Sequence, residues 1–123
     1  MSDKTVLLVD DSRVARMMTA AMIERVRPGW RIVEAASGEA ALTAAQGLPP
    51  DFVLLDVNMP GMGGLAAAER LRAEIPAARI SLLTANIQDP VRRRAEEIGV
   101  GFLVKPLREA DLRQFLECGQ APS

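Results

Sequence analysis

The stretch that decides the fold is Phe52-Val53-Leu54-Leu55-Asp56, which continues as VNMPGMGG over residues 57–64. Four apolar residues end abruptly in one carboxylate and are followed by a loop rich in glycine and proline. A short apolar run bounded by turn formers is typical of a strand covered on both faces, although the run alone does not exclude a buried helix. The aromatic and β-branched residues favour a strand. We therefore predict a buried strand that brings Asp56 to a surface crevice.

The composition indicates one ordinary domain. The chain has 123 residues, of which 49% are hydrophobic, enough for a continuous core at this size. The formal net charge is -1, so nothing in the charge balance suggests a nucleic-acid or membrane partner. The apolar runs are far too short for a signal or membrane segment. We expect a soluble, cytoplasmic monomer.

Two residue types restrict the chemistry. Histidine is absent, which excludes imidazole metal sites, histidine general bases and a Ser-His-Asp triad. Cys118 is the only cysteine, so an intrachain disulfide is excluded and a reducing cytosol is the expected compartment.

Strands and helices alternate along the rest of the chain. Further strands are predicted at residues 6–9, 31–35, 80–83 and 102–104, and helices at about 13–25, 38–45, 65–75, 90–98 and 108–116. Ser12, Ser37 and Asp89 are the predicted helix caps, and the more polar run 31–35 is a predicted edge strand. Five strands alternating with five helices predict a parallel α/β sheet with helices on both faces.

Two helical patterns have a structural and a functional interpretation. In the first helix, apolar residues recur at helical spacing, and we predict that they face the core rather than a partner; they are Val14, Met17, Met18, Ala21 and Met22. Arg92, Arg93 and Arg94 are consecutive and do not share one helix face. We predict a solvated surface with Glu96 and Glu97 as partners rather than an anion site.

Polar residues follow four of the predicted strands: Asp10, Asp11, Asp56, Thr84 and Lys105. Each is ordinary alone, but the carboxyl ends of parallel strands meet at one edge of a sheet, where ligands bind. Three gathered carboxylates repel one another, and a hard divalent cation, Mg²⁺, relieves this best at neutral pH. Asp56 then remains a carboxylate nucleophile for phosphorus, with Lys105 and Thr84 as phosphoryl ligands. The set has no evident base for fast hydrolysis, so it indicates a site that holds a phosphoryl group.

These segments resemble the receiver domain of the two-component response regulator family, and are similar to stand-alone chemotaxis and phosphorelay receivers. The resemblance covers nearly all of residues 5–116, and its motifs are Val9-Asp10-Asp11-Ser12, Leu55-Asp56-Val57-Asn58-Met59-Pro60-Gly61-Met62, Leu83-Thr84-Ala85 and Val104-Lys105-Pro106. It implies a flavodoxin-like fold with strand order 2-1-3-4-5. It also implies a receiver over residues 1–118 followed by a tail at 119–123.

The resemblance assigns a role to each site residue. Asp56 is implied as the phosphoacceptor, supplied by a histidine kinase or a histidine phosphotransfer protein. Asp11, Asp56 and the backbone carbonyl of Asn58 would ligate Mg²⁺, and Asp10 would act largely through water. Thr84 and Lys105 would hold the phosphoryl oxygens, and Phe102 would be the switch aromatic. The Lys105-Pro106 bond is expected to be cis.

The chain departs from the family pattern at two positions. Gly63 stands where Asp is common, so the cap of the next helix is expected to be weaker. The switch residue Phe102 has no phenol hydroxyl. Asn58 and Asn86 stand at the positions that influence phosphoryl lifetime in the family. Both are neutral, so we expect hydrolysis to be neither strongly blocked nor assisted.

The function implied is a single-domain response regulator that switches protein interactions on phosphorylation. It would be no enzyme apart from Mg²⁺-dependent self-phosphorylation and slow self-dephosphorylation. A phosphorelay shuttle and a receiver excised from a larger regulator are alternatives, and the downstream target is unknown. The expected target surface is the fourth and fifth helices, residues 92–97 and 108–117.

Two other classes fit less well. A haloacid dehalogenase-like phosphatase would need Asp at position 58, where Asn58 stands. A flavodoxin-like FMN binder would have its phosphate repelled by the clustered carboxylates, and few aromatic residues are available to stack the ring.

Overall fold

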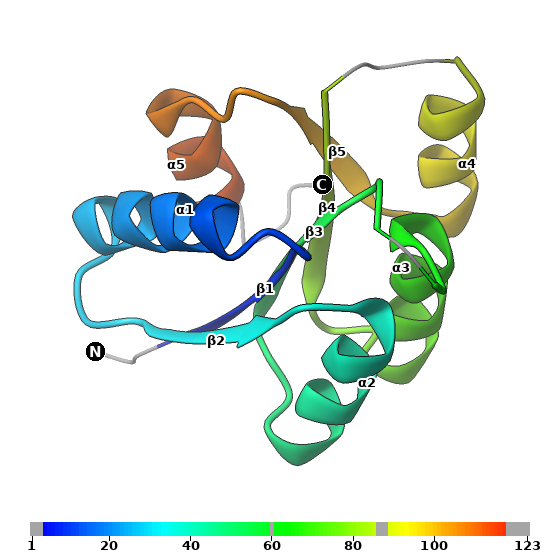
Figure 1. The fold of residues 1–123 in the computed structure, drawn as a ribbon, viewed down its shortest axis with the longest axis horizontal. Helices are drawn as coiled ribbons and strands as arrows, with labels where there is room; N and C mark the ends of the chain where they lie inside the picture. Colours follow the sequence, from blue (N-terminus) through cyan, green and yellow to red (C-terminus); the bar gives the residue numbers. More distant parts are fainter. Residues whose placement is uncertain (1–3, 60, 86–88, 118–123) are drawn as a thin grey trace.

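The computed structural model describes residues 4–59, 61–85 and 89–117, which form five strands and five helices in strict alternation (Figure 1). The strands are β1 (Thr5–Val9), β2 (Arg31–Ala35), β3 (Phe52–Asp56), β4 (Arg79–Thr84) and β5 (Gly101–Val104). The helices are α1 (Arg13–Val26), α2 (Gly38–Gly47), α3 (Gly64–Glu74), α4 (Asp89–Ile98) and α5 (Glu109–Glu117).

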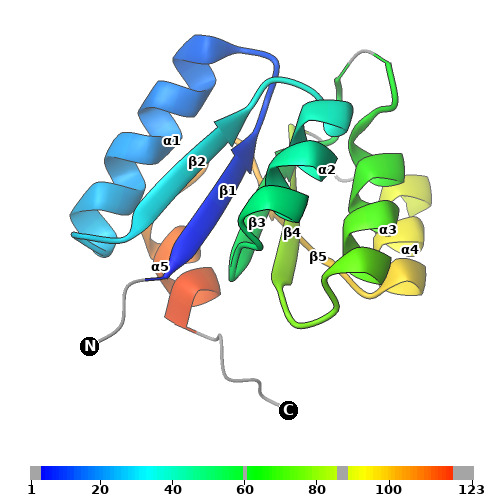
Figure 2. The same ribbon diagram turned by 90° about the horizontal axis from the view of Figure 1, so that it is seen from below.

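The strands form one parallel sheet in the order β2-β1-β3-β4-β5. Helices α1 and α5 cover one face, and α2, α3 and α4 cover the other (Figures 1 and 2). The predicted fold class, strand order and edge position of β2 are therefore confirmed. Among the described residues, no helix is long and apolar enough to cross a membrane.

Side-chain alternation along the central strands divides the core in two. In β3, Val53 and Leu55 belong to the apolar cluster under α2, α3 and α4, whereas Phe52 and Leu54 belong to the cluster under α1 and α5. Every residue of β3 is buried, because helices lie on both faces of the sheet. The four apolar residues quoted first are thus a fully covered strand, as predicted.

Local sequence signals set the starts of the first helices. Ser12 Oγ accepts a hydrogen bond from the Ala15 N–H at 3.2 Å, and Ser37 Oγ accepts one from the Ala40 N–H at 3.0 Å. Helix α3 begins after Gly63, which makes no side-chain capping bond and has φ +81°. The two serine caps and the weak start of α3 are therefore confirmed.

The predicted core face of α1 is wrong for all of its residues except Met22. Val14, Met17 and Met18 are 65%, 58% and 67% exposed, whereas Ile23 and Val26 are buried. Each residue advances 100° around a helix, so Val14, nine residues before Ile23, lies half a turn away from it. The helix carries two apolar stripes. Ile23 and Val26 pack in the cluster under α1 and α5, and the half-buried Met22 packs against that cluster.

The arginines of α4 behave as predicted. Arg92 lies 4.0 Å from Glu96, and Arg94 pairs with Glu97 at 3.1 Å. Arg94 also reaches Glu69 of α3 at 2.7 Å, so this pair ties two helices together.

Several predictions fall outside the described residues: those for Pro60, Asn86 and Cys118, the tail at 119–123, and the side chain of Asp89 as a cap.

Candidate functional site

Alternation in the strands places three charged side chains on the face covered by α1 and α5. Asp56 ends β3 and has the parity of Leu54, and Asp10 follows β1 with the parity of Leu8; both leucines belong to the α1 and α5 cluster. Lys105 follows β5 with the parity of Leu103, which packs against the same cluster. The sheet therefore collects Asp10, Asp56 and Lys105 at its carboxyl edge.

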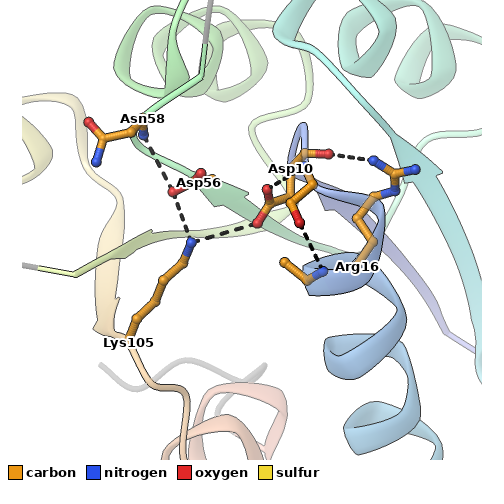
Figure 3. Close-up of polar contacts among 7 residues, drawn as sticks. Asp10, Arg16, Asp56, Asn58 and Lys105 are labelled. Carbon is orange, nitrogen blue, oxygen red and sulfur yellow. Dashed lines mark hydrogen bonds and ion pairs between the residues drawn. The ribbon is translucent and has the colours of Figure 1, made fainter.

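Lys105 bridges the two buried carboxylates (Figure 3). Its Nζ lies 3.2 Å from Asp56 Oδ1 and 3.7 Å from Asp10 Oδ2, and each aspartate is only 6% exposed. The Lys105-Pro106 bond that follows is cis, as expected. The ammonium thus occupies the position from which it can neutralise charge on a group attached to Asp56.

Three carboxylates form a cluster that fits a divalent cation. Asp10, Asp11 and Asp56 each offer an oxygen, and these oxygens lie within 4.8 Å of one another. Asp11 is exposed while the other two are buried, so one side of the cluster remains open to water. Hard oxygen donors with room for water suit Mg²⁺, and the residues present therefore fit that ion.

Burial raises the pKa of the Asp56 carboxyl above its ordinary value of 3.8. The Lys105 ammonium opposes this rise through its charge and its hydrogen bond, the Asp10 charge adds to it, and a bond from the Asn58 N–H opposes it. Burial is the largest influence on this pKa, so the ionised Asp56 carboxylate is unfavourable here unless further positive charge is bound.

The remaining predicted residues differ in how far they lie from the carboxylate cluster along the sheet. Thr84 is buried at the end of β4, next to β3 and β5, and its carbonyl accepts a bond from the Lys105 N–H at 2.8 Å. Asn58 donates its N–H to Asp56 Oδ1 at 3.4 Å. Phe102 lies two residues before the carboxyl end of β5, beside Leu82 in the sheet, and is half-buried. It is therefore not part of the carboxylate cluster.

The loop after Asp56 returns close to the strand it leaves. The Gly64 N–H donates to the Val57 carbonyl at 3.1 Å. A Cβ on Gly64 would overlap the Asp56 carbonyl oxygen and lie 2.7 Å from Val57 Cα. Only glycine fits between the start of α3 and the end of β3, and this close contact fixes the backbone that carries Asp56.

Sequence reasoning missed two residues beside the site, Arg16 and Glu34. Arg16 Nη1 donates to the Asp10 carbonyl at 2.6 Å, and Arg16 Nε donates to Glu34 Oε1 at 2.8 Å. The register of β1 and β2 places Glu34 beside Leu8, just before the acidic loop. The available signal in the sequence was Glu34, a carboxylate near the carboxyl end of the predicted strand 31–35.

The family model that matches this chain is the response regulator receiver domain, over residues 6–117. The chain belongs to the response regulator receiver family. Receiver domains are the signal-receiving modules of two-component systems, and the family binds Mg²⁺ through an acidic aspartate cluster of the kind formed here by Asp10, Asp11 and Asp56. This membership decides against the phosphatase and flavin-binding alternatives.

Curated relatives of this receiver domain are longer regulators. It is 39% identical over 122 residues to the positive alginate biosynthesis regulatory protein of Pseudomonas aeruginosa, covering 96% of the chain and 48% of the relative. It is 33% identical to the nitrate/nitrite response regulator protein NarL of Escherichia coli, covering 91% of the chain and 52% of NarL. The chain thus spans about half the length, or less, of the curated relatives that it matches.

Solved structures include receivers of nearly the same length. The chemotaxis response regulator CheY4 of Vibrio cholerae superposes with a TM-score of 0.84 at 30% identity, covering 96% of this chain and 99% of that one. A LuxR-family response regulator from Aurantimonas gives a TM-score of 0.85 at 34% identity, covering 95% of this chain and 84% of that one.

Proposed function

We propose that this receiver domain accepts a phosphoryl group on Asp56 from a phosphohistidine and thereby switches its protein interactions. The observation that carries the proposal is the buried Asp56 carboxylate, with Lys105 at 3.2 Å and two further carboxylates within 4.8 Å. A nucleophile, a cation site and a fixed ammonium are the groups that phosphoryl acceptance requires.

The transfer is a displacement at phosphorus. An Asp56 carboxylate oxygen forms the new P–O bond as the P–N bond to the donor imidazole breaks, and the electron pair of that bond returns to the ring, which takes up a proton. The product is an acyl phosphate on Asp56. A water molecule later attacks it, which regenerates the carboxylate and releases inorganic phosphate.

Several residues of this chain would balance the charge during the transfer. Lys105 holds one phosphoryl oxygen, and the buried Thr84 hydroxyl donates to another. Asp11, Asp56 and the Asn58 carbonyl would hold Mg²⁺, with Asp10 acting through water. When bound, Mg²⁺ supplies positive charge that keeps Asp56 ionised and neutralises phosphoryl oxygens.

The exposed face of α1 fits the docking of the phosphohistidine donor. A groove of about 210 Å³ runs from Asp10 and Lys105 along apolar side chains that include Met18, Met22 and Leu107. A donor protein must bring its imidazole to Asp56, so the donor must contact the surface of this chain beside the site. The exposed Met18 and the groove offer apolar area there.

The output surface is proposed to be α4 and α5, with Phe102 as the link. The Arg92 Cζ of α4 lies 5.9 Å from the Phe102 ring centre. Movement of Thr84 toward the phosphoryl group would let Phe102 turn inward, and Arg92 would lose this cation–π contact, which is worth about 0.5–1 kcal/mol at an exposed site. The surface of α4 would then change.

The pathway depends on what the receiver serves. Three kinds of receiver use the same acceptor chemistry. They are a single-domain regulator as in chemotaxis, a phosphorelay shuttle, and the receiver of a longer regulator. The longer curated relatives favour no particular output, because a receiver serves regulators of different kinds.

A beryllofluoride titration tests the proposal, because beryllofluoride bonds to a carboxylate as a phosphoryl mimic. We expect Mg²⁺ alone to shift the backbone amide resonances of the carboxylate cluster, and those of Thr84 and Phe102 to shift only when beryllofluoride and Mg²⁺ are both present. Asp56→Asn should remove the response. A full response in that variant, or in EDTA, would contradict Asp56 as the acceptor.

A further inference from the structure

Arg16 joins three elements beside the carboxylate cluster. Arg16 lies in α1, and the two partners of its guanidinium described above are outside that helix. They lie at the ends of β1 and β2. Its guanidinium donates to the Asp10 carbonyl at 2.6 Å (Figure 3). It also donates to Glu34 at 2.8 Å, and its side chain is only 14% exposed. A planar fork held at two points has little freedom to move.

Asp10 is consequently held at each of its polar groups. Its N–H donates to the Ala35 carbonyl at 3.1 Å, its own carbonyl accepts from Arg16, and its Oδ1 accepts from the Ser12 N–H at 2.9 Å. Without Arg16, the carbonyl between Asp10 and Asp11 loses its side-chain donor. The peptide plane that sets the direction of Asp11 is then less restrained.

We propose that Arg16, oriented by Glu34, is a positioning residue that holds the Asp10-Asp11 loop in the shape that binds the divalent cation. The proposal rests on the proposed Mg²⁺-dependent acceptance of phosphate at Asp56. Arg16 touches neither the phosphoryl group nor the cation in this role. It acts through the Asp10 carbonyl, as groups that orient metal ligands do.

Charge and positioning predict opposite effects. A guanidinium near the cluster repels a divalent cation, so removal of its charge alone would tighten Mg²⁺ binding. Loss of a positioning contact would weaken binding, on the order of tenfold, the lower end of what such partners contribute. The sign of the change therefore identifies the role.

The test is Mg²⁺ affinity of the whole chain, measured by calorimetry and by amide shifts of Asp11 and Ser12. We expect Arg16→Gln to raise the Kd about tenfold. Arg16→Lys should also weaken binding, because lysine keeps the charge but cannot donate to the Asp10 carbonyl and Glu34 as a fork. Phosphorylation of Arg16→Gln by phosphoramidate should need more Mg²⁺ for half its maximal rate and approach the wild-type rate at saturation.

Arg25→Gln is the matched control, since Arg25 is an exposed arginine of α1 that pairs with Glu109. It should leave the Kd unchanged, and urea unfolding shows that each variant is folded under the assay conditions. Unchanged or tighter Mg²⁺ binding by a folded Arg16→Gln would overturn the role of Arg16. A wild-type chain that fails to bind Mg²⁺ would instead contradict the proposed function.

Discussion

At the scale of single residues, the burial of Asp56 makes its ionised carboxylate unfavourable in the folded chain. Burial raises its pKa above 3.8 despite the Lys105 ammonium, so the folded chain holds this proton more tightly than the unfolded chain. The stabilising contribution is complete below the ordinary pKa and is lost as pH rises through the folded pKa. Ionised Asp56 therefore lowers the free energy of unfolding at neutral pH.

Asp56→Asn should accordingly be more stable than the wild type at pH 7 in EDTA. The difference should shrink as pH falls toward 3.8, where the wild-type carboxyl becomes protonated. Urea unfolding at several pH values measures it, with Glu24→Gln as the control for loss of one exposed negative charge. A variant that is no more stable than the wild type at pH 7 would show that Lys105 outweighs burial.

The residues that end strands could be predicted because the parallel sheet alone brings them together. Asp10, Asp56 and Lys105 needed only their positions after apolar runs. Arg16 could not be found this way, because its role depends on contacts from a helix to a backbone carbonyl and to a neighbouring strand. Helical spacing gives no information on such a contact.

At the scale of elements, the junction of β3 and α3 depends on Gly64. A methyl group there would overlap backbone atoms of residues 56 and 57, which cannot rotate away as side chains can. We expect Gly64→Ala to lower the free energy of unfolding by about 3 kcal/mol, the upper part of the range for overpacking. Urea unfolding followed by Trp30 fluorescence measures this change.

Gly63→Ala is the neighbouring comparison. No atom lies within 4 Å of a Cβ at Gly63, but its φ of +81° is strained for alanine. Its cost should be about 1–2 kcal/mol, clearly less than that of Gly64→Ala. An equal or larger loss at Gly63 would mean that the close contact at Gly64 relaxes freely.

The exposed stripe of α1 carries the prediction for donor docking. Met18→Gln should slow phosphotransfer from a histidine kinase that phosphorylates the wild type, roughly tenfold for loss of a well-packed apolar contact. Its phosphorylation by phosphoramidate, which needs no docking surface, should remain unchanged. Equal slowing with both donors would place Met18 in the acceptor site instead.

This helix also shows where sequence periodicity fails. Both apolar stripes of α1 have helical spacing, so the pattern predicts the helix correctly without deciding which stripe is buried. The choice depends on how α1 lies against the sheet and α5. That arrangement is a tertiary property, in contrast to the serine caps, whose partners are three residues away.

At the scale of the whole molecule, Trp30 and the site lie at opposite ends of the sheet. Trp30 stacks on Phe52 at 5.4 Å between ring centres, and Phe52 begins the strand that Asp56 ends. Four strand steps separate these two residues by about 13 Å. Trp30 fluorescence should therefore change little on Mg²⁺ binding and strongly on unfolding. Large quenching by Mg²⁺ in the folded chain would contradict this separation.

The fold as a whole could be predicted because its signals agree with one another. Apolar runs of strand length, amphipathic helices between them and turn residues at their ends allow one class of sheet. The strand order came from the family resemblance rather than from periodicity, because local patterns do not encode which strands are neighbours.

The most direct test of the central claim is phosphorylation of the whole chain by phosphoramidate, followed by intact mass spectrometry. We expect the wild type to gain one phosphoryl group in Mg²⁺ and none in EDTA, and the group to be lost in hydroxylamine, as an acyl phosphate is. Asp56→Asn should gain none. Phosphate that survives hydroxylamine, or labelling that survives Asp56→Asn, would contradict an acyl phosphate on Asp56.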